Sequence, residues 1–372
     1  MRVALVRQRY TPFGGAERFV ERAFGALSDQ GVSVTVISRK WQSDNRNSLD
    51  CDPFYIGRLW RDAGFSRCVQ NLLKHANFDL IQSHERIPGC TVFRAGDGVH
   101  AAWLAQRALH EKWLGRDWSS WSPWHRYTLA AENKTFRDPA LKAVICISRM
   151  VRNDIIHHYG VDAAKLHVIY NGLDLDRFHP ELARQYRLAV RSRLGVPADT
   201  PTFLYVGSGY ARKGVSVLIE AAARMRNTKA RFWIVGIDKQ LDSYRKQAGK
   251  RGVEERFNFL GGQSDVCPFL GAADAFVLPT LYEPLSNAVL EALASGLPVV
   301  TTTACGAAEL IRDGESGFVC AAGDPVVLAA RLDVLAEPGV ACAMRPAARE
   351  SVAHLPIQAM AEQLIQLYRS LS

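Results

Sequence analysis

The sequence predicts an α/β protein that contains two doubly wound parallel sheets. Three observations support this fold class. The chain has 372 residues, enough for two domains of about 100–200 residues each. Short β-branched runs alternate with amphipathic segments of helix length, which is typical of βαβ crossovers. The composition, 48% hydrophobic and 22% charged, excludes a disordered or fibrous chain.

The strands and helices are expected in alternation along the chain. In the first half, strands are expected at Val3–Arg7, Ser33–Ser38, Leu80–Ser83 and Ala143–Ile147. In the second half, they are expected at Thr202–Val206, Arg231–Val235, Phe257–Leu260, Ala275–Leu278 and Pro298–Thr302. Amphipathic helices are expected at Ala16–Asp29, Val215–Met225, Leu241–Lys250 and Asn287–Ser295.

We place the domain boundary at the turn-forming run Asn171-Gly172-Leu173-Asp174, which follows an expected strand at Val168–Tyr170. The first Rossmann-like domain would span 1–172 and the second 173–356. The helical segment 357–372 has no strand after it and could pack on either domain. If it packs on the first domain, the chain crosses back to it at this point. Ligands of such sheets bind at the carboxyl ends of the strands, so the expected site is a cleft where the two domains face each other.

The net charge of +9 indicates an anionic partner: nucleic acid, an anionic membrane surface or a phosphorylated ligand. Residues 1–180 hold 25 Lys and Arg against 18 Asp and Glu, so most of the excess lies in the first half. No apolar run reaches the ~18 residues of a membrane span. The N-terminus reads as a strand and not as a signal peptide, so we expect a cytoplasmic protein.

The eight cysteines are scattered and form no C-x-x-C pair. In a chain of this length without a secretory signal, such cysteines are expected to be reduced and mostly buried. The sequence therefore predicts neither a disulfide framework nor a zinc site.

Two glycine-rich loops directly follow expected strands. Gly14 and Gly15 come after the first strand and begin a helix, where backbone amides can approach an anion. The loop 207–214, which begins with Gly207, carries Arg212 and Lys213. The planar guanidinium of the arginine and the compact ammonium of the lysine together suit two neighbouring phosphates. Taken alone, the first loop could also be an ordinary Gly-Gly turn without a ligand. The second could also be a basic turn that is simply exposed to solvent.

A third motif, Glu283 followed by Glu291, comes after the strand that ends near Leu278. Ser286 or Asn287 can cap the helix through Glu291, which leaves the amides of 286–288 for an anionic oxygen. The Glu283 carboxylate can accept hydrogen bonds from sugar hydroxyls. The alternative is that Glu283 is an acid stabilised by the helix dipole and Glu291 a surface residue.

The glycine pair, the Arg-Lys pair and the two glutamates, in this order and at these separations, resemble the retaining nucleotide-sugar glycosyltransferases of family 4, which have the GT-B fold. The resemblance covers essentially the whole chain and is greatest to the lipopolysaccharide core glucosyltransferase I group. It implies that Gly14 and Gly15 approach the donor diphosphate and sugar. Arg212 and Lys213 would hold the diphosphate, Glu283 the sugar hydroxyls and Glu291 the ribose. The distal phosphate would meet the amides of Ser286, Asn287 and Ala288.

The resemblance implies transfer of a hexose, glucose by this reading, from a UDP-sugar to a lipopolysaccharide core or similar glycolipid. No D-x-D pair lies in a suitable loop, so cationic side chains and helix N-termini would replace a metal, and no cofactor is expected. Gln263 stands where relatives often have Arg near the base, which leaves guanosine and adenosine donors open. Asp97 is the first candidate on the acceptor side, with His84 and His100 as alternatives.

Two other functions compete with this reading. One is a GDP-mannose-dependent mannosyltransferase of the same fold, and the other is a sugar-nucleotide binder without catalysis. Nucleic acid is not expected as a partner, because no RNA-binding, zinc-finger or helix-turn-helix motif is found and the basic residues are dispersed.

Residues 101–137 are expected to contact an anionic membrane surface. Five of the eight tryptophans lie there, together with six Lys and Arg residues, a composition typical of interfacial helices. The alternative is an ordinary helix that packs its tryptophans into the core. The segment coincides with a membrane-interacting region of the resembled group, which implies a peripheral protein at the cytoplasmic face of the inner membrane.

Overall fold

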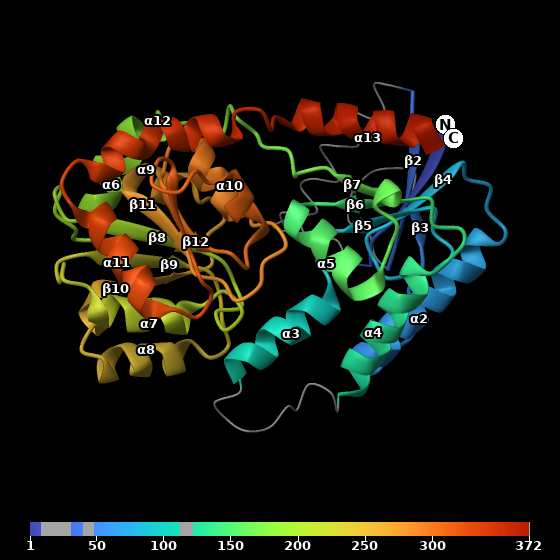
Figure 1. Ribbon diagram of the computed structural model, residues 1–372, viewed down its shortest axis with the longest axis horizontal. Coiled ribbons are helices and arrows are strands. Elements are labelled where there is room, and N and C mark those ends of the chain that lie inside the picture. The colour runs from blue at the N-terminus through green and yellow to red at the C-terminus, as the bar shows by residue number, and fades with distance from the viewer. Residues whose placement is uncertain (9–30, 40–47, 112–121, 372) are drawn as a thin grey trace. The chain divides into compact units, whose positions relative to one another are not determined.

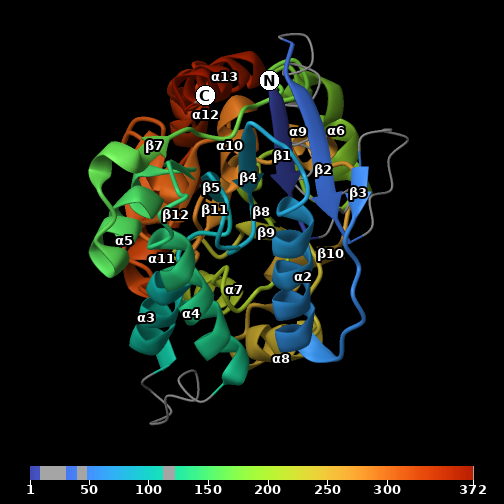
Figure 2. The same ribbon diagram turned by 90° about the vertical axis from the view of Figure 1, so that its right-hand side faces the viewer.

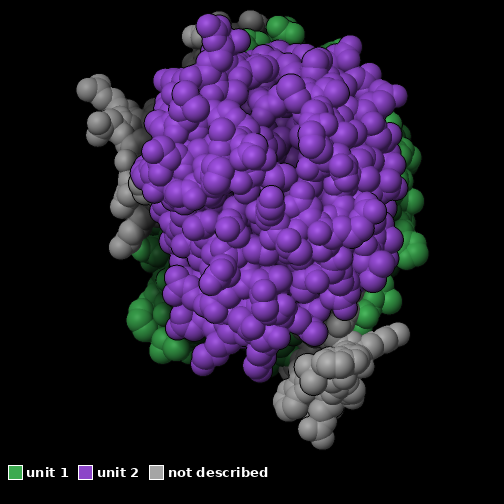
Figure 3. All heavy atoms as spheres, turned by 90° about the vertical axis from the view of Figure 1, so that its left-hand side faces the viewer, with its two compact units in different colours: residues 1–172, 357–372 green, residues 173–356 purple. Residues whose placement is uncertain are grey.

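The structure is a computed structural model that describes residues 1–8, 31–39, 48–111 and 122–371 (Figure 1). The helix expected at Ala16–Asp29 lies outside this part. The chain forms two compact units, unit 1 with residues 1–172 and 357–372, and unit 2 with residues 173–356 (Figure 3).

Unit 1 is built on a parallel sheet in the order β3-β2-β1-β4-β5-β6-β7. Its strands are β1 (Arg2–Val6), β2 (Ser33–Ser38), β3 (Ser48–Asp50), β4 (Leu80–Ser83), β5 (Val92–Ala95), β6 (Ala143–Cys146) and β7 (Leu166–Val168). Its helices are α2 (Gly57–Leu73), α3 (His100–Glu111), α4 (Pro123–Phe136), α5 (Arg149–Tyr159), the short η3 (Ala163–Lys165) and α13 (Ile357–Leu371).

The central strand of this sheet is buried on both faces. In β1, Val3 and Leu5 pack in one cluster with side chains of α13, whereas Ala4 and Val6 pack in another with Phe65 of α2. Successive side chains of a strand point to opposite faces of the sheet. A strand made only of apolar residues therefore needs other elements packed on both faces. The terminal helix α13, which the sequence could assign to either domain, therefore covers one face of the sheet of unit 1 (Figure 2).

The chain passes between the units at 172/173 and again at 356/357, and the two crossing segments run side by side. The Leu173 amide donates to the Leu355 carbonyl at 2.8 Å. A Cβ atom on Gly172 would lie 2.6 Å from the Ile357 Cα atom. Glycine is thus required here because the backbone at the start of α13 approaches it closely.

Unit 2 repeats the same plan, with a parallel sheet in the order β10-β9-β8-β11-β12-β13. Its strands are β8 (Thr202–Val206), β9 (Arg231–Val235), β10 (Phe257–Gly261), β11 (Ala275–Leu278), β12 (Val299–Thr302) and β13 (Gly317–Cys320). Its helices are α6 (Leu182–Arg193), α7 (Val215–Arg224), α8 (Leu241–Lys250), η4 (Glu254–Arg256), α9 (Cys267–Ala272), α10 (Asn287–Ala294), η5 (Gly306–Leu310), α11 (Pro325–Ala336) and α12 (Val340–Val352). In Figure 1, α7 and α8 lie on one side of this sheet and α10 on the other.

The expected strands agree with those found, apart from differences of one residue at several ends, and the strand expected at Val168–Tyr170 is instead β7, Leu166–Val168. Three strands were not predicted. In β5 the buried Arg94 interrupts the apolar run, β3 has three exposed residues, and β13 begins with a glycine. Among the described residues, no helix combines the length and apolarity needed to cross a bilayer.

The prediction that the cysteines are all reduced is wrong at one pair. Cys51, directly after β3, and Cys68, in α2, form a disulfide with their Cα atoms 6.0 Å apart. They are 17 residues apart and form no recognisable spacing motif, so only the packing of α2 against the sheet brings them together. Of the remaining cysteines, five are buried thiols and Cys342 is exposed.

We predict that replacing Gly172 by alanine lowers the free energy of unfolding by about 1–3 kcal/mol, because the methyl group must displace the backbone of α13. Chemical denaturation of Gly172→Ala measures this loss. Gly96→Ala is the matched control in unit 1, since nothing lies within 4 Å of the position that its Cβ atom would take. Equal stability of the two variants would show that α13 does not depend on this close approach.

Candidate functional site

The order of the strands in unit 2 fixes where its loops meet. From β8 the chain proceeds to β9 on one side, whereas from β11 it proceeds to β12 on the other, and β8 and β11 are neighbours. The sheet therefore has its topological switch point between these two strands, where open α/β sheets bind ligands. The loop after β8 carries Arg212 and Lys213, and the segment after β11 carries Glu283.

The structure brings these three side chains together on one oxygen atom. Glu283 Oε2 lies 2.9 Å from Arg212 Nη1 and 3.1 Å from Lys213 Nζ. The Glu283 and Lys213 side chains are only 12% and 13% exposed, whereas that of Arg212 is 36% exposed. Two cations share one carboxylate, so the cluster has a net charge of +1 and attracts an anion.

Backbone contacts fix the position of each member of this cluster. Arg212 Nη1 also donates to the Tyr282 carbonyl at 2.7 Å. The Leu281 amide in turn donates to the Arg212 carbonyl at 2.8 Å. The backbone of Glu283 pairs with a neighbouring segment, donating to Ala304 and accepting from Gly306. The carboxylate thus sits on a backbone held from both sides.

Two glycines make room for this arrangement. A Cβ atom on Gly207 would lie 2.6 Å from Lys213 Cδ, so the lysine side chain lies directly over the first residue of the loop. Gly214 has a φ of +76° and a Cβ atom there would lie 1.9 Å from the Pro279 carbonyl oxygen. The loop therefore approaches the segment after β11 at a distance that only glycine allows.

Helix α10 begins at the same edge of the sheet. Ser286 is its N-cap, and its hydroxyl accepts from the Val289 amide at 3.4 Å. Asn287 and Ala288 are the first two helical residues, where backbone amides have no acceptor within the helix. Glu291 lies one turn further into the helix and is half-buried. The first turn of α10 thus adds a positive dipole end beside the Glu283 segment.

Gln263 follows β10, two strands away from β8, and is exposed. Its Nε2 donates to the Leu260 carbonyl of its own loop at 2.7 Å. The loops after β8, β9 and β10 are linked through their backbones, since Gly207 donates to Val235 and Gly236 donates to Gly261. The structure places Gln263 at this carboxyl edge but not in contact with the Arg212 cluster.

Unit 1 has its switch point between β1 and β4. Arg7, directly after β1, lies 3.7 Å from both Glu85 and Asp97 through Nη1. The Asp97 side chain is 55% exposed, as an acceptor-side acid must be to reach a ligand. The sequence did not single out Arg7 or Glu85, although Arg7 directly follows β1 and Glu85 is the second residue after β4. Gly14 and Gly15, also expected here, lie outside the described residues.

The two alternative histidines are enclosed within unit 1. His84 is buried, with Nε2 3.1 Å from Gln82 Nε2, and Gln82 accepts from the Tyr368 hydroxyl of α13 at 2.6 Å. Burial, together with Arg94 and Arg7, holds the pKa of His84 well below its ordinary value. His84 therefore serves the docking of α13, and the exposed Asp97 is better placed to meet an acceptor.

His100 lies at the start of α3 with its Nε2 2.9 Å from His125 Nδ1. Its amide donates to the buried Glu132 carboxylate at 2.7 Å, which also accepts from Arg86. Burial, with a further contribution from Arg86, lowers the pKa of His100 to about 4. The ring is neutral at neutral pH and belongs to the packing between α3 and α4.

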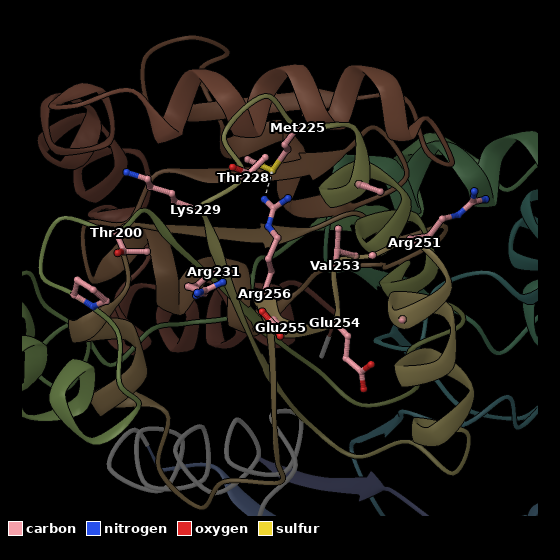
Figure 4. Close-up of a pocket in the computed structure, with 14 residues that line it drawn as sticks. Thr200, Met225, Thr228, Lys229, Arg231, Arg251, Val253, Glu254, Glu255 and Arg256 are labelled. Atoms are coloured by element: carbon pink, nitrogen blue, oxygen red, sulfur yellow. Dashed lines mark hydrogen bonds between the residues drawn. The ribbon is translucent and has the colours of Figure 1, made fainter.

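A hollow of unit 2 with a volume of about 830 Å³ lies away from these residues. Its lining comes from the amino ends of the strands, with Arg231 at the start of β9 and Arg256 directly before β10 (Figure 4). Arg256 is buried and bonds to the carbonyls of Ala222, Asn227 and Ala230. None of the expected site residues lines this hollow, and its buried arginine is committed to the backbone.

In the described part of the chain, no group of three His, Cys, Asp or Glu residues could hold a metal ion.

We predict that unit 1 loses stability as the pH falls from about 6.5 to about 4, because the unfolded state binds a proton at His100 that the folded state resists. The expected loss from this one histidine is about 3 kcal/mol. His100→Gln should flatten the dependence of thermal stability on pH over this range. His354→Gln, at an exposed position of unit 2, should retain the slope of the parent protein, and an unchanged slope in His100→Gln would contradict the prediction.

The family comparisons agree with this geometry. A model described as "Glycosyltransferase Family 4" matches residues 13–177, and one described as "Glycosyl transferases group 1" matches residues 200–337. The chain is 29% identical over 327 residues to the lipopolysaccharide glucosyltransferase WaaG of Escherichia coli, covering 86% of this chain and 85% of that protein.

Solved structures show the same architecture. The crystal structure of WaaG, a glycosyltransferase involved in lipopolysaccharide biosynthesis, matches with a TM-score of 0.84 and 26% identity, covering 98% of this chain and 99% of that one. The Anabaena protein Alr3699/HepE in complex with UDP-glucose shares the fold, with a TM-score of 0.74 and 20% identity over 100% of both chains. The chain is thus a glycosyltransferase of family 4 with the GT-B fold, related to the lipopolysaccharide core glucosyltransferases.

Proposed function

We propose that the enzyme transfers glucose from UDP-glucose to a lipopolysaccharide core or similar glycolipid, with retention of configuration and without a metal. The observation that carries this proposal is the contact of Arg212 and Lys213 with a single oxygen atom of Glu283 at the switch point of unit 2. This arrangement presents two cations beside one carboxylate, which matches a donor that has a diphosphate joined to a sugar.

In this mechanism Arg212 and Lys213 bind the diphosphate. Arg212 uses Nη1 for both of its bonds, so Nη2 and Nε have no bond to a described residue. Lys213 has three protons, and the ion pair with Glu283 engages one of them. The free donors can therefore stabilise the charge that grows on the phosphate as the glycosyl bond breaks. The amides of Ser286, Asn287 and Ala288 would take up the distal phosphate.

Glu283 would accept hydrogen bonds from hydroxyls of the donor sugar, and Glu291 from the ribose. In a retaining transfer without a covalent enzyme intermediate, the acceptor oxygen attacks the face of the sugar that the phosphate leaves. The bond from C1 to the phosphate oxygen breaks, the bond from C1 to the acceptor oxygen forms, and the acceptor proton passes to the departing phosphate. Asp97 would orient the acceptor hydroxyl from unit 1.

The choice of uridine is supported by the solved complex of the similarly folded HepE with UDP-glucose. In this chain backbone hydrogen bonds hold the loops after β8, β9 and β10 side by side, and main-chain groups of these loops outside those bonds would contact the base. A thermal-shift panel of UDP-, GDP- and ADP-sugars tests the choice, and UDP-glucose should give the largest shift. The largest shift with GDP-mannose would favour the mannosyltransferase instead. NMR of the product should show that the new linkage keeps the anomeric configuration of the donor.

The acceptor side of the proposal is supported by the relation to WaaG, a lipopolysaccharide glucosyltransferase. The segment 101–137 contains α3 and α4, and at its described end Trp124 is directed inward, donating to Asp62 at 2.8 Å. Trp113, Trp118 and Trp121 lie outside the described residues. We retain 101–137 as part of a membrane-facing surface of a peripheral enzyme at the cytoplasmic face of the inner membrane.

We predict that Arg212→Ala and Lys213→Ala each lower kcat/KM for UDP-glucose by about 10²–10³-fold, because each removes a charged donor that acts on the leaving phosphate. Glu283→Gln should lower it by at least about tenfold, since it removes a charged hydrogen-bond acceptor. Steady-state transfer to the glycolipid measures these values. Lys229→Ala is the matched control, because this exposed lysine lines the hollow at the opposite edge of the sheet, and it should retain full activity.

We also predict that transfer proceeds at an unchanged rate in excess chelator, because side chains and the first turn of α10 supply the positive charge at the diphosphate. The rate of UDP release, measured with and without EDTA, checks this. Activity that disappears with EDTA and returns with magnesium would require a metal in the reaction.

A further inference from the structure

Three large apolar side chains are exposed within seven residues at the start of α2. Phe54 is 83% exposed, Ile56 68% and Trp60 59%. We call these three side chains the apolar wedge. Leu188 and Ile237 in unit 2 are exposed singly, and single exposed residues need no explanation. A group of three does, because it keeps apolar surface in contact with water.

The backbone that carries the apolar wedge is firmly anchored. Arg39 is buried, and its guanidinium donates to Asp52 Oδ1 and to the Pro53 carbonyl, each at 2.8 Å. It also donates to the Arg61 carbonyl at 2.6 Å and lies 4.7 Å from the centre of the Tyr55 ring. Side chains on an anchored segment cannot fold back to cover themselves, so their exposure belongs to the folded state.

The disulfide adds a second anchor to the same segment. Cys51 immediately precedes it and Cys68 lies in the helix that follows, so the cross-link closes the stretch that contains the wedge. Gly57, with a φ of +72°, turns the chain into α2. The apolar wedge therefore projects from a short segment fixed at both ends.

The charge around the wedge is positive. Arg58, at the start of α2, and Arg126, at the start of α4, are exposed, and Arg58 lies 5.7 Å from the centre of the Trp124 ring of α4. The nearby carboxylates are already paired, Asp52 with Arg39 and Asp62 with Arg61. The surface at the start of α2 thus combines apolar side chains with arginines whose charge is not cancelled by these acids.

This surface lies at the end of unit 1 where the membrane-facing segment is proposed. Figures 1 and 2 show the start of α2, the start of α4 and the end of α3 at the same end of the unit. Leu109, near the end of α3, is 61% exposed. Three elements therefore carry exposed apolar or cationic side chains at this end of the unit.

We propose that the apolar wedge inserts into the headgroup and upper acyl region of an anionic bilayer, with Arg58 and Arg126 held by acidic lipid headgroups. The inference rests on the proposed use of a membrane-bound acceptor and adds the apolar wedge and Arg58, which lie outside 101–137, to the membrane-facing surface. Tryptophan favours the interface, aliphatic and phenyl groups gain free energy on leaving water, and arginines gain it near anionic lipid. An acidic protein partner would match the charge, but three apolar side chains projecting from one short segment fit a bilayer better.

The test is co-sedimentation of the full chain with vesicles of phosphatidylglycerol and phosphatidylcholine. The double variant Phe54→Ser/Ile56→Ser should lower the partition coefficient at least about tenfold, because two apolar groups no longer leave water. Leu188→Ser/Ile237→Ser is the matched control, with residues 79% and 66% exposed in unit 2, and it should bind as the parent does. Vesicles of phosphatidylcholine alone should bind all three proteins weakly.

A second measurement, fluorescence quenching, reports how deeply Trp60 enters the bilayer. Brominated lipids should quench the fluorescence of the parent protein more than that of Trp60→Phe, because bromine then lies close to the Trp60 indole. Equal binding by the wedge variant and the control, or equal quenching, would overturn the proposal. Loss of a dimer in sedimentation velocity without a change in vesicle binding would also overturn it, by assigning the wedge to contacts between copies.

Failure of this proposal can be distinguished from failure of the proposed function. Hydrolysis of UDP-glucose in the absence of lipid depends on unit 2 and should be the same in the wedge variant and the parent. If that hydrolysis is absent in both, the proposed donor is wrong and the vesicle result still stands. The melting temperature of the wedge variant should equal that of the parent, since both side chains are exposed.

Discussion

The ion pair cluster at Glu283 depends on the order of strands in unit 2. Arg212 and Lys213 follow β8, and Glu283 follows β11, 70 residues further along the chain from Lys213. They meet because β8 and β11 are neighbours from which the chain departs in opposite directions. Gly214 allows the two loops to touch, since any side chain would collide with the Pro279 carbonyl. The chemistry at this point therefore rests on a constraint of sheet topology.

Burial distinguishes this cluster from an ordinary surface ion pair. Exposed ion pairs contribute little free energy because water competes for both charges. Lys213 and Glu283 are mostly enclosed, while Arg212 has one side open to solvent. In the proposed reaction the carboxylate would keep the two cations in place before a donor binds, and the open side of Arg212 would let a phosphate join them. A preorganised positive site needs little rearrangement when negative charge develops on the leaving group.

The sequence predicts best those positions in the fold that follow from periodicity along the chain. The strand pattern, the loops after β8 and β11 and the Ser286 cap could be predicted, because periodicity and cap chemistry act over a few residues. Contacts across the fold could not be predicted. The Cys51–Cys68 pair depends on how α2 packs, and the place of Arg7 beside Glu85 and Asp97 depends on the neighbours of β1. The burial of His84 likewise requires α13, which comes from the other end of the chain.

The net charge of +9 also has a different meaning once the structure is known. Several arginines are buried and serve the protein's own backbone: Arg39 bonds to the carbonyls of Pro53 and Arg61, and Arg191 to those of Pro197 and Ala272. Such residues contribute to the total but offer few donors to a partner. The charge available to an anion is concentrated where arginines are exposed or half-exposed. Arg212 provides it at the switch point of unit 2, and Arg58 beside the apolar wedge of unit 1. Under the two proposals, a diphosphate and a bilayer would each be bound by one modestly basic chain, because the fold decides which of its cations face outward.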